Sequence, residues 1–229
     1  RILDQQSPTR ICTTVLDRST GQTTELVENA TAVSAEEVSA FAEEYRNYVS
    51  SADVVVLTGS LPTGAPATLY HDLLADTDCP VILDARGPEL EAALIQSPFL
   101  VKPNLEELEQ TLARSLPSTD QMIKGMQEIN QRGATWVVIS QGKDALWATS
   151  EQQVYRFTPA KAKVVNPIGC GDSLAAGIAC GIHEGRSVPD AIRWGMASAA
   201  DNLTQLLPAR LSKTSVQTFF EQIEMEQLV

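Results

Sequence analysis

Short runs of consecutive apolar residues alternate along this chain with longer segments in which apolar residues recur every three or four positions. The runs predict strands at 53–57, 81–83, 99–101 and 135–139, and the first of them is typical of a parallel strand covered on both faces. Helical spacing predicts helices at 34–49, 67–75, 90–95, 118–131, 172–182, 188–203 and about 215–223. Because strand and helix alternate, the pattern predicts an α/β fold with a mainly parallel central sheet.

The first part of the chain follows a different pattern. Residues 11–16 and 23–27 predict two strands, with a polar turn at 17–22 between them. One side of this hairpin is polar, so we expect it at an edge of the fold or as a lid, not in the core. Further along, 146–148 and 154–157 predict a meander of two more strands.

The composition fits one domain of this class. The length of 229 residues suits a single α/β domain, and 43% hydrophobic with 5% aromatic residues suits a core of Val, Ile, Leu and Ala. The net charge of −12 makes nucleic acid and anionic membrane surfaces poor partners, although a local basic pocket remains compatible with it. No apolar run approaches the roughly 18 residues that span a bilayer, and no secretory leader pattern opens the chain.

The cysteines predict free thiols. Cys12, Cys79, Cys170 and Cys180 form no CxxC pair, and the two histidines lie far apart, so no metal cage is expected. A reducing, cytoplasmic location is the expectation that follows.

The segment 164–173 reads Val-Val-Asn-Pro-Ile-Gly-Cys-Gly-Asp-Ser and leads directly into an apolar helix of small residues. Gly169 and Gly171 would let the backbone approach a ligand, and the first N–H groups of the helix would attract an anion. Asp172 can be a base that takes a proton from a hydroxyl attacking a phosphoryl group, or it can cap the helix. The loop by itself leaves both interpretations open.

A second polar segment, Lys-Pro-Asn-Leu-Glu-Glu-Leu at 102–108, follows the strand at 99–101. Asn104 and Glu107 have the spacing of a helix capping arrangement. The same spacing would place them to hold the water shell of a Mg²⁺ ion, which favours carboxylate and water ligands. Spacing does not decide between the two.

Five segments together resemble the ribokinase-like (PfkB-type) carbohydrate kinases. Residues 166–173 are similar to the family's C-terminal signature, Asp-Thr-x-Gly-Ala-Gly-Asp. Thr-Gly-Ser-Leu-Pro at 58–62 and Lys-Pro-Asn-x-x-Glu-Leu at 102–108 resemble the 1-phosphofructokinase and tagatose-6-phosphate kinase branch, and Ser-Gln-Gly at 140–142 and Thr-Arg at 9–10 complete the set. The resemblance extends from about Pro8 to the last helix. The opening strand–helix units of the family pattern are not visible, so a shortened or naturally short chain is expected.

The resemblance implies a three-layer αβα fold with a small β lid, formed here by the hairpin at 11–27. Residues 1–229 would be one kinase domain that lacks the family's N-terminal units, with 166–184 as the anion-hole loop and its helix. Asp172 would be the catalytic base. The N–H groups of Gly169, Cys170 and Gly171 would form the anion hole for the transferring phosphoryl group.

The resemblance also assigns the cofactor and substrate contacts. Asn104 and Glu107 would organise Mg²⁺ through water, and Ser140 and Gly142 would lie beside the ATP phosphates. The residues implied for the sugar phosphate are Arg10, Ser60 and Lys102, although Lys102 could equally extend along the surface.

Four positions depart from the family pattern. Cys170 replaces Ala or Ser, and the helix dipole is expected to lower the pKa of its thiol. Asn166 replaces an Asp, as in the tagatose-6-phosphate kinase branch. Ala145 stands where Gly is usual and would be strained in a left-handed conformation. Arg86 lies in Asp-Ala-Arg-Gly, where Asp-Ser-Ser or Asp-Thr-Ser is common, and it can read a phosphate or another sugar, or pair with an acid such as Glu89.

The expected function is ATP-dependent phosphorylation of fructose 1-phosphate, fructose 6-phosphate or tagatose 6-phosphate to a bisphosphate. Two alternatives stay open: a kinase of an unphosphorylated sugar or nucleoside, and a non-catalytic module that binds a nucleotide or a sugar phosphate. A small molecule is the expected partner, and a homodimer through the exposed edge of the lid is compatible with the pattern.

Overall fold

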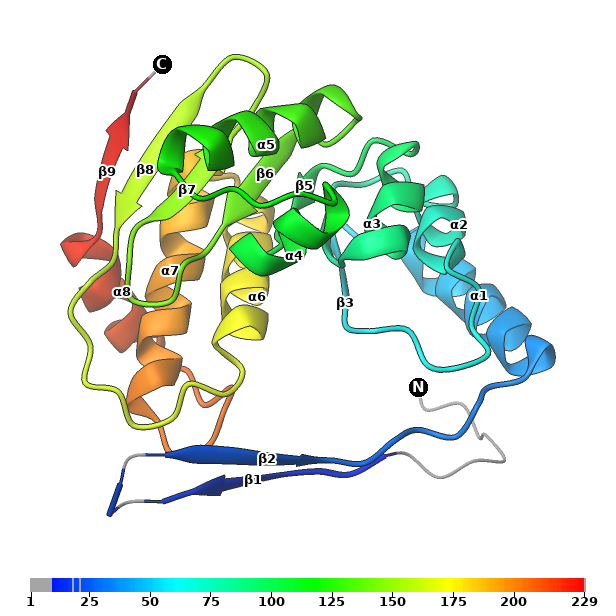
Figure 1. Cartoon of the computed structure of the whole chain (residues 1–229), viewed down its shortest axis with the longest axis horizontal. Coiled ribbons are helices and arrows are strands. Elements are labelled where there is room, and N and C mark those ends of the chain that lie inside the picture. Colours follow the sequence, from blue (N-terminus) through cyan, green and yellow to red (C-terminus); the bar gives the residue numbers. More distant parts are fainter. Residues whose placement is uncertain (1–9, 18, 21, 229) are drawn as a thin grey trace.

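The computed structural model describes residues 10–17, 19–20 and 22–228. A seven-stranded sheet in the order β3-β4-β5-β6-β7-β8-β9 crosses the molecule (Figure 1). Its strands are β3 (Val55–Thr58), β4 (Val81–Asp84), β5 (Leu100–Val101), β6 (Trp136–Ile139), β7 (Leu146–Thr149), β8 (Val154–Thr158) and β9 (Glu224–Gln227). Pairing is parallel from β3 to β6 and antiparallel from β6 to β9, so only β7 and β9 run against the other strands of this sheet.

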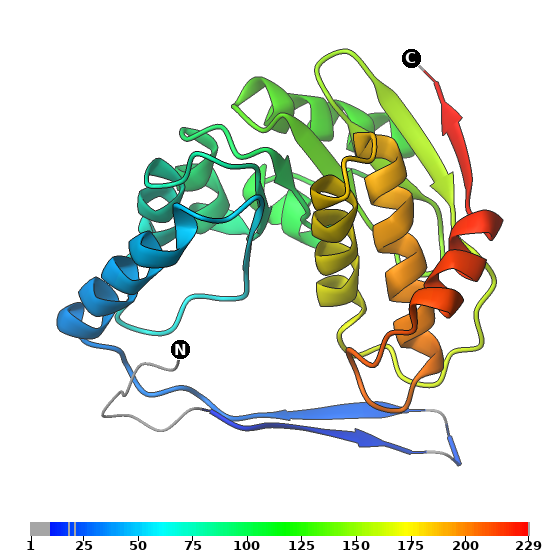
Figure 2. The same ribbon diagram turned by 180° about the vertical axis from the view of Figure 1, so that it is seen from behind.

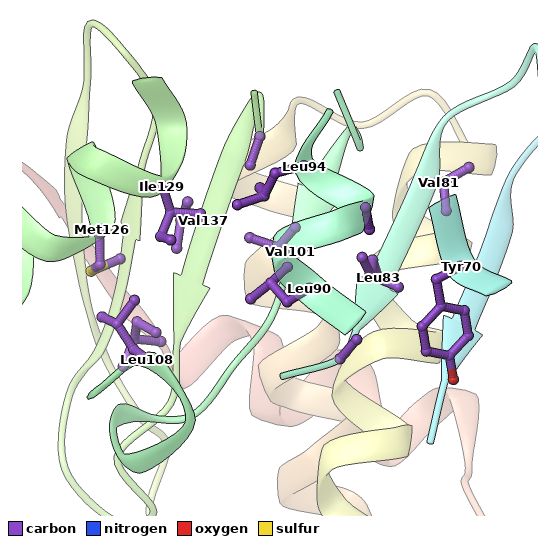
Figure 3. Packing of buried hydrophobic residues seen from close by; sticks show 14 of the residues in the cluster. Tyr70, Val81, Leu83, Leu90, Leu94, Val101, Leu108, Met126, Ile129 and Val137 are labelled. Carbon is purple, nitrogen blue, oxygen red and sulfur yellow. The ribbon is translucent and has the colours of Figure 1, made fainter. Parts of the chain in front are cut away.

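One layer of helices lies on the first face of the sheet. It consists of α1 (Ala35–Val49), α2 (Leu69–Ala75), α3 (Gly87–Leu94), α4 (Leu105–Thr111) and α5 (Thr119–Gln131). Alternate strand residues such as Leu83, Val101 and Val137 point toward these helices and pack with Leu90 and Ile129 (Figure 3). Burial of this apolar surface is what holds the layer in place.

The second layer covers the opposite face with α6 (Cys170–His183), α7 (Val188–Thr204) and α8 (Lys213–Gln222) (Figure 2). The intervening strand residues Ile82, Leu100 and Val138 are fully buried in a second apolar cluster with these helices. The predicted three-layer αβα architecture with a mainly parallel sheet is therefore confirmed.

Helices α6 and α7 approach each other closely because small residues face each other at their crossing. A Cβ added at Gly177 would lie 2.6 Å from Gly195 Cα, and one added at Gly195 would lie 2.6 Å from the Leu174 carbonyl oxygen. No side chain fits between the two backbones here. The middle of α6 is thus fixed against α7 by backbone-to-backbone packing.

The predicted hairpin is confirmed as β1 (Cys12–Leu16) and β2 (Thr23–Val27), which pair antiparallel with Cys12 opposite Val27. It lies apart from the large sheet, at the end of the molecule where α6 begins (Figures 1 and 2). Hydrogen bonds from Ser19 and Thr20 to the Asp17 carboxylate lower its pKa to about 2. Both strands are mostly exposed.

The strand predicted at 53–57 is confirmed as β3, which pairs parallel with β4 and contacts the apolar clusters on both faces of the sheet, with Leu57 buried and Val55 and Val56 half-buried. β9 was missed, since Glu-Met-Glu-Gln at 224–227 is exposed and carries no strand pattern, yet it pairs antiparallel with β8.

Element boundaries shift by a few residues, as is usual at helix ends. α3 begins at Gly87 instead of residue 90, with Pro88 in its first turn, and α6 begins at Cys170 instead of residue 172. Among the residues that the structure describes, no helix is long and apolar enough to cross a membrane.

Candidate active site

A cavity of about 380 Å³ opens at the carboxyl ends of the parallel strands, the usual ligand position in open α/β sheets. It joins the exits of β3 and β4 with the first turns of α3, α4 and α6. Its lining residues are Thr58, Gly59, Ser60, Leu61, Tyr70, Asp84, Ala85, Arg86, Glu89, Glu107 and Asp172. A larger hollow of about 580 Å³ lies between α1, β3 and α2, but it contains none of the predicted catalytic residues.

The glycine loop meets α6 as the sequence predicts. Gly169 has φ +75°, a left-handed conformation that glycine adopts without strain, and a Cβ there would lie 3.0 Å from Pro208 Cβ. The helix begins at Cys170, and Asp172 stands in its first turn, exposed and facing the cavity. In the described part of the chain the N–H groups of Gly171 and Asp172 meet no carbonyl, whereas that of Cys170 donates to Pro167 O at 3.3 Å. Unpaired N–H groups beside the positive end of a helix can bind an anion.

Two asparagines fasten this loop to the end of α7. Asn166 accepts from Ile168 N–H at 3.0 Å and donates through Nδ2 to Leu206 O at 2.9 Å. Asn202, which is buried, donates to Ile168 O at 2.8 Å. A carboxylate at position 166 could not donate to Leu206 O, so the amide there has a structural reason.

The pKa of the Cys170 thiol shifts in the direction opposite to the expected one. Burial raises the pKa of Cys170, and this effect outweighs the hydrogen bond that Asn202 donates to its Sγ at 3.3 Å. The expectation of a lowered pKa was wrong because the side chain turns toward α7, where its Sγ lies 3.7 Å from Ala199 O, instead of toward solvent.

Lys102 does not extend along the surface. It is 5% exposed, and its Nζ lies 2.9 Å from Asp84 Oδ2 at the end of β4. A Cβ added at Gly171 would lie 3.8 Å from the same Nζ, so the ammonium group is beneath the glycine loop. The Asp84 carboxylate offsets its charge, and together they form an ion pair on the wall of the site.

Asn104 and Glu107 form a complete capping box at the start of α4. Glu107 N–H donates to Asn104 Oδ1 and Asn104 N–H donates to Glu107 Oε2, both at 2.9 Å. The other carboxylate oxygen, Oε1, lies 3.6 Å from Arg86 Nη1. The two residues therefore cap the helix, and the same hydrogen bonds hold the Glu107 carboxylate at the cavity.

These residues fit a magnesium ion that is held through water. Carboxylates of Asp84, Glu89, Glu107 and Asp172 line the cavity. In the described ranges, no three His, Cys, Asp or Glu side chains converge closely enough to form a metal cage. A hard cation with several waters of its own is compatible with carboxylates spaced in this way.

Ser140 and Gly142 follow β6 and lie next to this region. Ser140 forms a parallel bridge with Asn104, and Gly142 has φ +62° with open space where a Cβ would be. Ala145 avoids the strain expected of it, because Ser97, Ala113 and Ala209 are the non-glycine residues with positive φ in the described chain.

The three residues predicted for the sugar phosphate occupy different environments. Ser60 lines the cavity, in a loop braced by the hydrogen bond from Tyr70 Oη to Gly59 O at 2.6 Å. Lys102 is buried behind the wall, as described above. Arg10 is exposed just before β1 and does not line the cavity.

The family model of the pfkB family carbohydrate kinases matches residues 2–213 of this chain. The chain belongs to the pfkB family of carbohydrate kinases. It is accordingly a sugar kinase, a phosphotransferase, and membership of this family implies the use of ATP, typically with Mg²⁺.

Solved structures agree with this assignment. Phosphofructokinase-2 from Escherichia coli in complex with potassium superposes with a TM-score of 0.87 at 25% identity, over 96% of this chain and 72% of that one. The same enzyme in complex with fructose-6-phosphate superposes with a TM-score of 0.80 at 26% identity, over 92% of this chain and 69% of that one. A possible 1-phosphofructokinase from Thermotoga maritima superposes with a TM-score of 0.87 at 19% identity, over 96% of this chain and 71% of that one. At this identity the similarity is one of fold. The ribokinase-like fold is thereby confirmed for this pfkB kinase.

Sequence reasoning missed three residues of the site of this pfkB kinase. Asp84 pairs with Lys102, Tyr70 braces the loop before Ser60, and Asn202 holds the glycine loop. The Asp at the end of a buried strand was a usable signal, because ligands bind at strand carboxyl ends. Tyr70 and Asn202 lie in ordinary helical patterns and gave none.

Proposed function

We propose that this chain catalyses the ATP-dependent phosphorylation of a sugar phosphate to a bisphosphate, with fructose 1-phosphate, fructose 6-phosphate or tagatose 6-phosphate as acceptor. Asp172 takes the proton of the acceptor hydroxyl. The hydroxyl oxygen bonds to the γ-phosphorus of ATP while the bond between that phosphorus and the bridging oxygen of ADP breaks. The N–H groups of the Gly169–Gly171 loop, of which that of Gly171 meets no carbonyl in the described chain, stabilise the charge on the transferring group, and the Cys170 N–H would have to exchange its 3.3 Å contact with Pro167 O to join them.

One observation carries this proposal. Helix α6 begins directly after the left-handed Gly169, and the Asp172 carboxylate in its first turn faces the same cavity as the β3 and β4 exit loops. A carboxylate that only capped the helix would gain nothing from facing that cavity. A base beside unpaired N–H groups is suited to phosphoryl transfer, which depends chiefly on positioning and charge neutralisation.

The surrounding charges support the same reaction. The Lys102 ammonium lies beneath the glycine loop, where Asp84 holds it and offsets its charge, so it can donate a hydrogen bond near the anion hole. Asn104 and Glu107 would hold Mg²⁺ through its waters, and the ion when bound neutralises phosphate oxygens. We assign Ser140 and Gly142 to the ATP phosphates because Ser140 forms a bridge with Asn104 at the exit of β6 and Gly142 follows two residues later in the same loop.

The function is tested by a coupled ADP-release assay on this chain and on any longer parent polypeptide. Each is given Mg²⁺, ATP and a panel of ketohexose phosphates, free ketohexoses and nucleosides. We expect turnover of at least one ketohexose phosphate, with kcat/KM at least about tenfold above that of the matching free sugar. A preference for a free sugar or nucleoside would overturn the acceptor class. ATP binding without turnover by either polypeptide would favour the non-catalytic module.

We further propose that residues 11–27 act as the lid of a single kinase domain and that two chains associate through it. Four apolar side chains of the hairpin region are 50–70% exposed: Ile11, Val15, Leu26 and Val27. An isolated two-stranded sheet is only marginally stable in water, so a covering surface is needed.

The dimer is tested by placing a charge on the hairpin. Replacing Leu26→Lys should raise the dissociation constant of the dimer at least about tenfold, because a buried leucine contributes roughly 1.5–3 kcal/mol. Sedimentation velocity measures this as a shift from dimer to monomer. Ile95→Lys is the control, since Ile95 is 74% exposed at the end of α3. A wild-type chain that sediments as a monomer, or equal effects of both variants, would contradict the proposal.

A further inference from the structure

Arg86 stands at the junction between β4 and α3, directly on the cavity. Its backbone is extended, with φ −141° and ψ 166°, and it precedes Gly87, the first residue of the helix. Gly87 N–H donates to Thr111 Oγ1 at 3.1 Å, which ties this junction to α4. The backbone of Arg86 is therefore fixed against the helix that carries Glu107.

The side chain of Arg86 is held much less firmly than its backbone. It is 57% exposed, and its Nη1 lies 3.6 Å from Glu107 Oε1, a distance too long for a good hydrogen bond. No other hydrogen bond or ion pair of this guanidinium is formed within the described part of the chain. Most of its five N–H donors are thus available to a ligand.

The charges around Arg86 make it the cation of this cavity. Four carboxylates line the wall, from Asp84, Glu89, Glu107 and Asp172, and Arg86 is the one Lys or Arg among the lining residues. A phosphate monoester that entered a cavity with only the carboxylates would be repelled. A sugar that carries such a group needs a cationic partner inside the cavity.

The other two basic residues predicted to bind the sugar phosphate are poorly placed to meet a phosphate group inside the cavity. Lys102 is buried behind the wall, and Asp84 already offsets its charge at 2.9 Å. Arg10 lies outside the cavity, before the exposed hairpin. The positive charge that a substrate would meet inside is that of Arg86.

We infer that Arg86 binds the phosphate group already present on the acceptor sugar, and that it exchanges its loose contact with Glu107 for a bidentate contact with that phosphate. This inference rests on the proposed function and specifies how the acceptor is selected. The planar guanidinium matches two phosphate oxygens at once, and such charge-assisted pairs are strong and directional. Arg86 is accordingly a specificity-determining residue that separates phosphorylated from free sugars.

The test compares Arg86→Gln and Arg86→Lys with the wild-type chain in kinetics and in calorimetric binding without ATP. The ligands are the best ketohexose phosphate of the panel and the matching free ketohexose. Arg86→Gln should raise both Kd and KM for the sugar phosphate about tenfold or more, because a charged hydrogen bond is lost. The KM for ATP and the binding of the free sugar should stay within about twofold, and Arg86→Lys should be intermediate because lysine binds phosphate as a point charge.

A matched control is Arg46→Gln. The Arg46 side chain is 51% exposed and forms one ion pair, with Asp76 at 3.1 Å, far from the cavity lining. It should leave both substrates unaffected. Unchanged sugar-phosphate binding in Arg86→Gln, or a rise in the KM for ATP alone, would overturn the inference, since the residue would then act on Glu107 or the nucleotide. If the wild-type chain binds sugar phosphate in an Arg86-dependent way but transfers no phosphoryl group, the inference stands and the proposed reaction fails.

Discussion

Replacing Asp172→Asn should lower kcat by about 10²–10⁴-fold while nucleotide binding is retained, because a positioned general base contributes rate of this order. Asparagine keeps the size of the side chain and its place in the first turn of α6, but it cannot accept the hydroxyl proton. Loss of the carboxylate also removes a negative charge beside the anion hole, so ATP should bind equally well or more tightly. Single-turnover kinetics and calorimetry with ATP measure the two effects separately.

Asp120→Asn is the matched control for this experiment. Asp120 is also exposed in the first turn of a helix, α5, and it does not line the cavity. Its replacement should change stability by a few tenths of a kcal/mol through the helix dipole and leave kcat unaltered. If Asp172→Asn behaved in the same way, Asp172 would be a helix cap and our assignment of the base would be wrong.

Gly195→Ala should lower the free energy of unfolding by roughly 2–3 kcal/mol, as overpacking in a rigid core does. In an open helix the same change would stabilise by up to about 1 kcal/mol, so the sign itself reports the packing. The added Cβ would lie 2.6 Å from Leu174 O and 2.6 Å from Ile178 Cγ1 on the facing helix. Because Leu174 belongs to α6, which also carries Asp172, kcat should fall as well.

The stability change is measured by urea denaturation of both variants, with Gly125→Ala as the control. A Cβ at Gly125 would lie 2.9 Å from Leu112 Cδ1, at the end of a flexible side chain that can turn away. Its cost should therefore be clearly smaller than that of Gly195→Ala. A stabilising Gly195→Ala would show that α6 and α7 can separate without penalty.

Most of the fold could be predicted because its signals are local. The helical spacing at 34–49, the apolar run at 135–139 and the polar turn of the hairpin each depend on neighbouring residues in sequence. β9 could not be predicted, since an exposed strand forms only through its partner β8, which is distant in sequence.

The candidate site likewise has some features that local sequence patterns predict and others that depend on distant residues. Gly169 and Asp172 were found because a glycine before a helix has a recognisable pattern, and the structure brings Asp172 and Glu107 to one cavity. The burial of Lys102 depends on Asp84, eighteen positions earlier. Likewise, the pKa of Cys170 depends on how α7 packs, which no local pattern describes. The catalytic and ligand roles of all the predicted site residues, including Ser140, Gly142 and Arg10, stay predictions.

The hydrogen bonds of Asn166 also bear on how this protein ages chemically. Both polar atoms of its side chain are in use, and deamidation would replace the donor to Leu206 O with a second acceptor, turning an attraction into a repulsion. Asparagine usually deamidates when the backbone nitrogen of the next residue attacks its side chain, and Pro167 has no N–H to lose in that step. The proline that follows Asn166 in the glycine loop thus also protects the amide that anchors this loop, so long storage should spare this position while exposed asparagines elsewhere are converted.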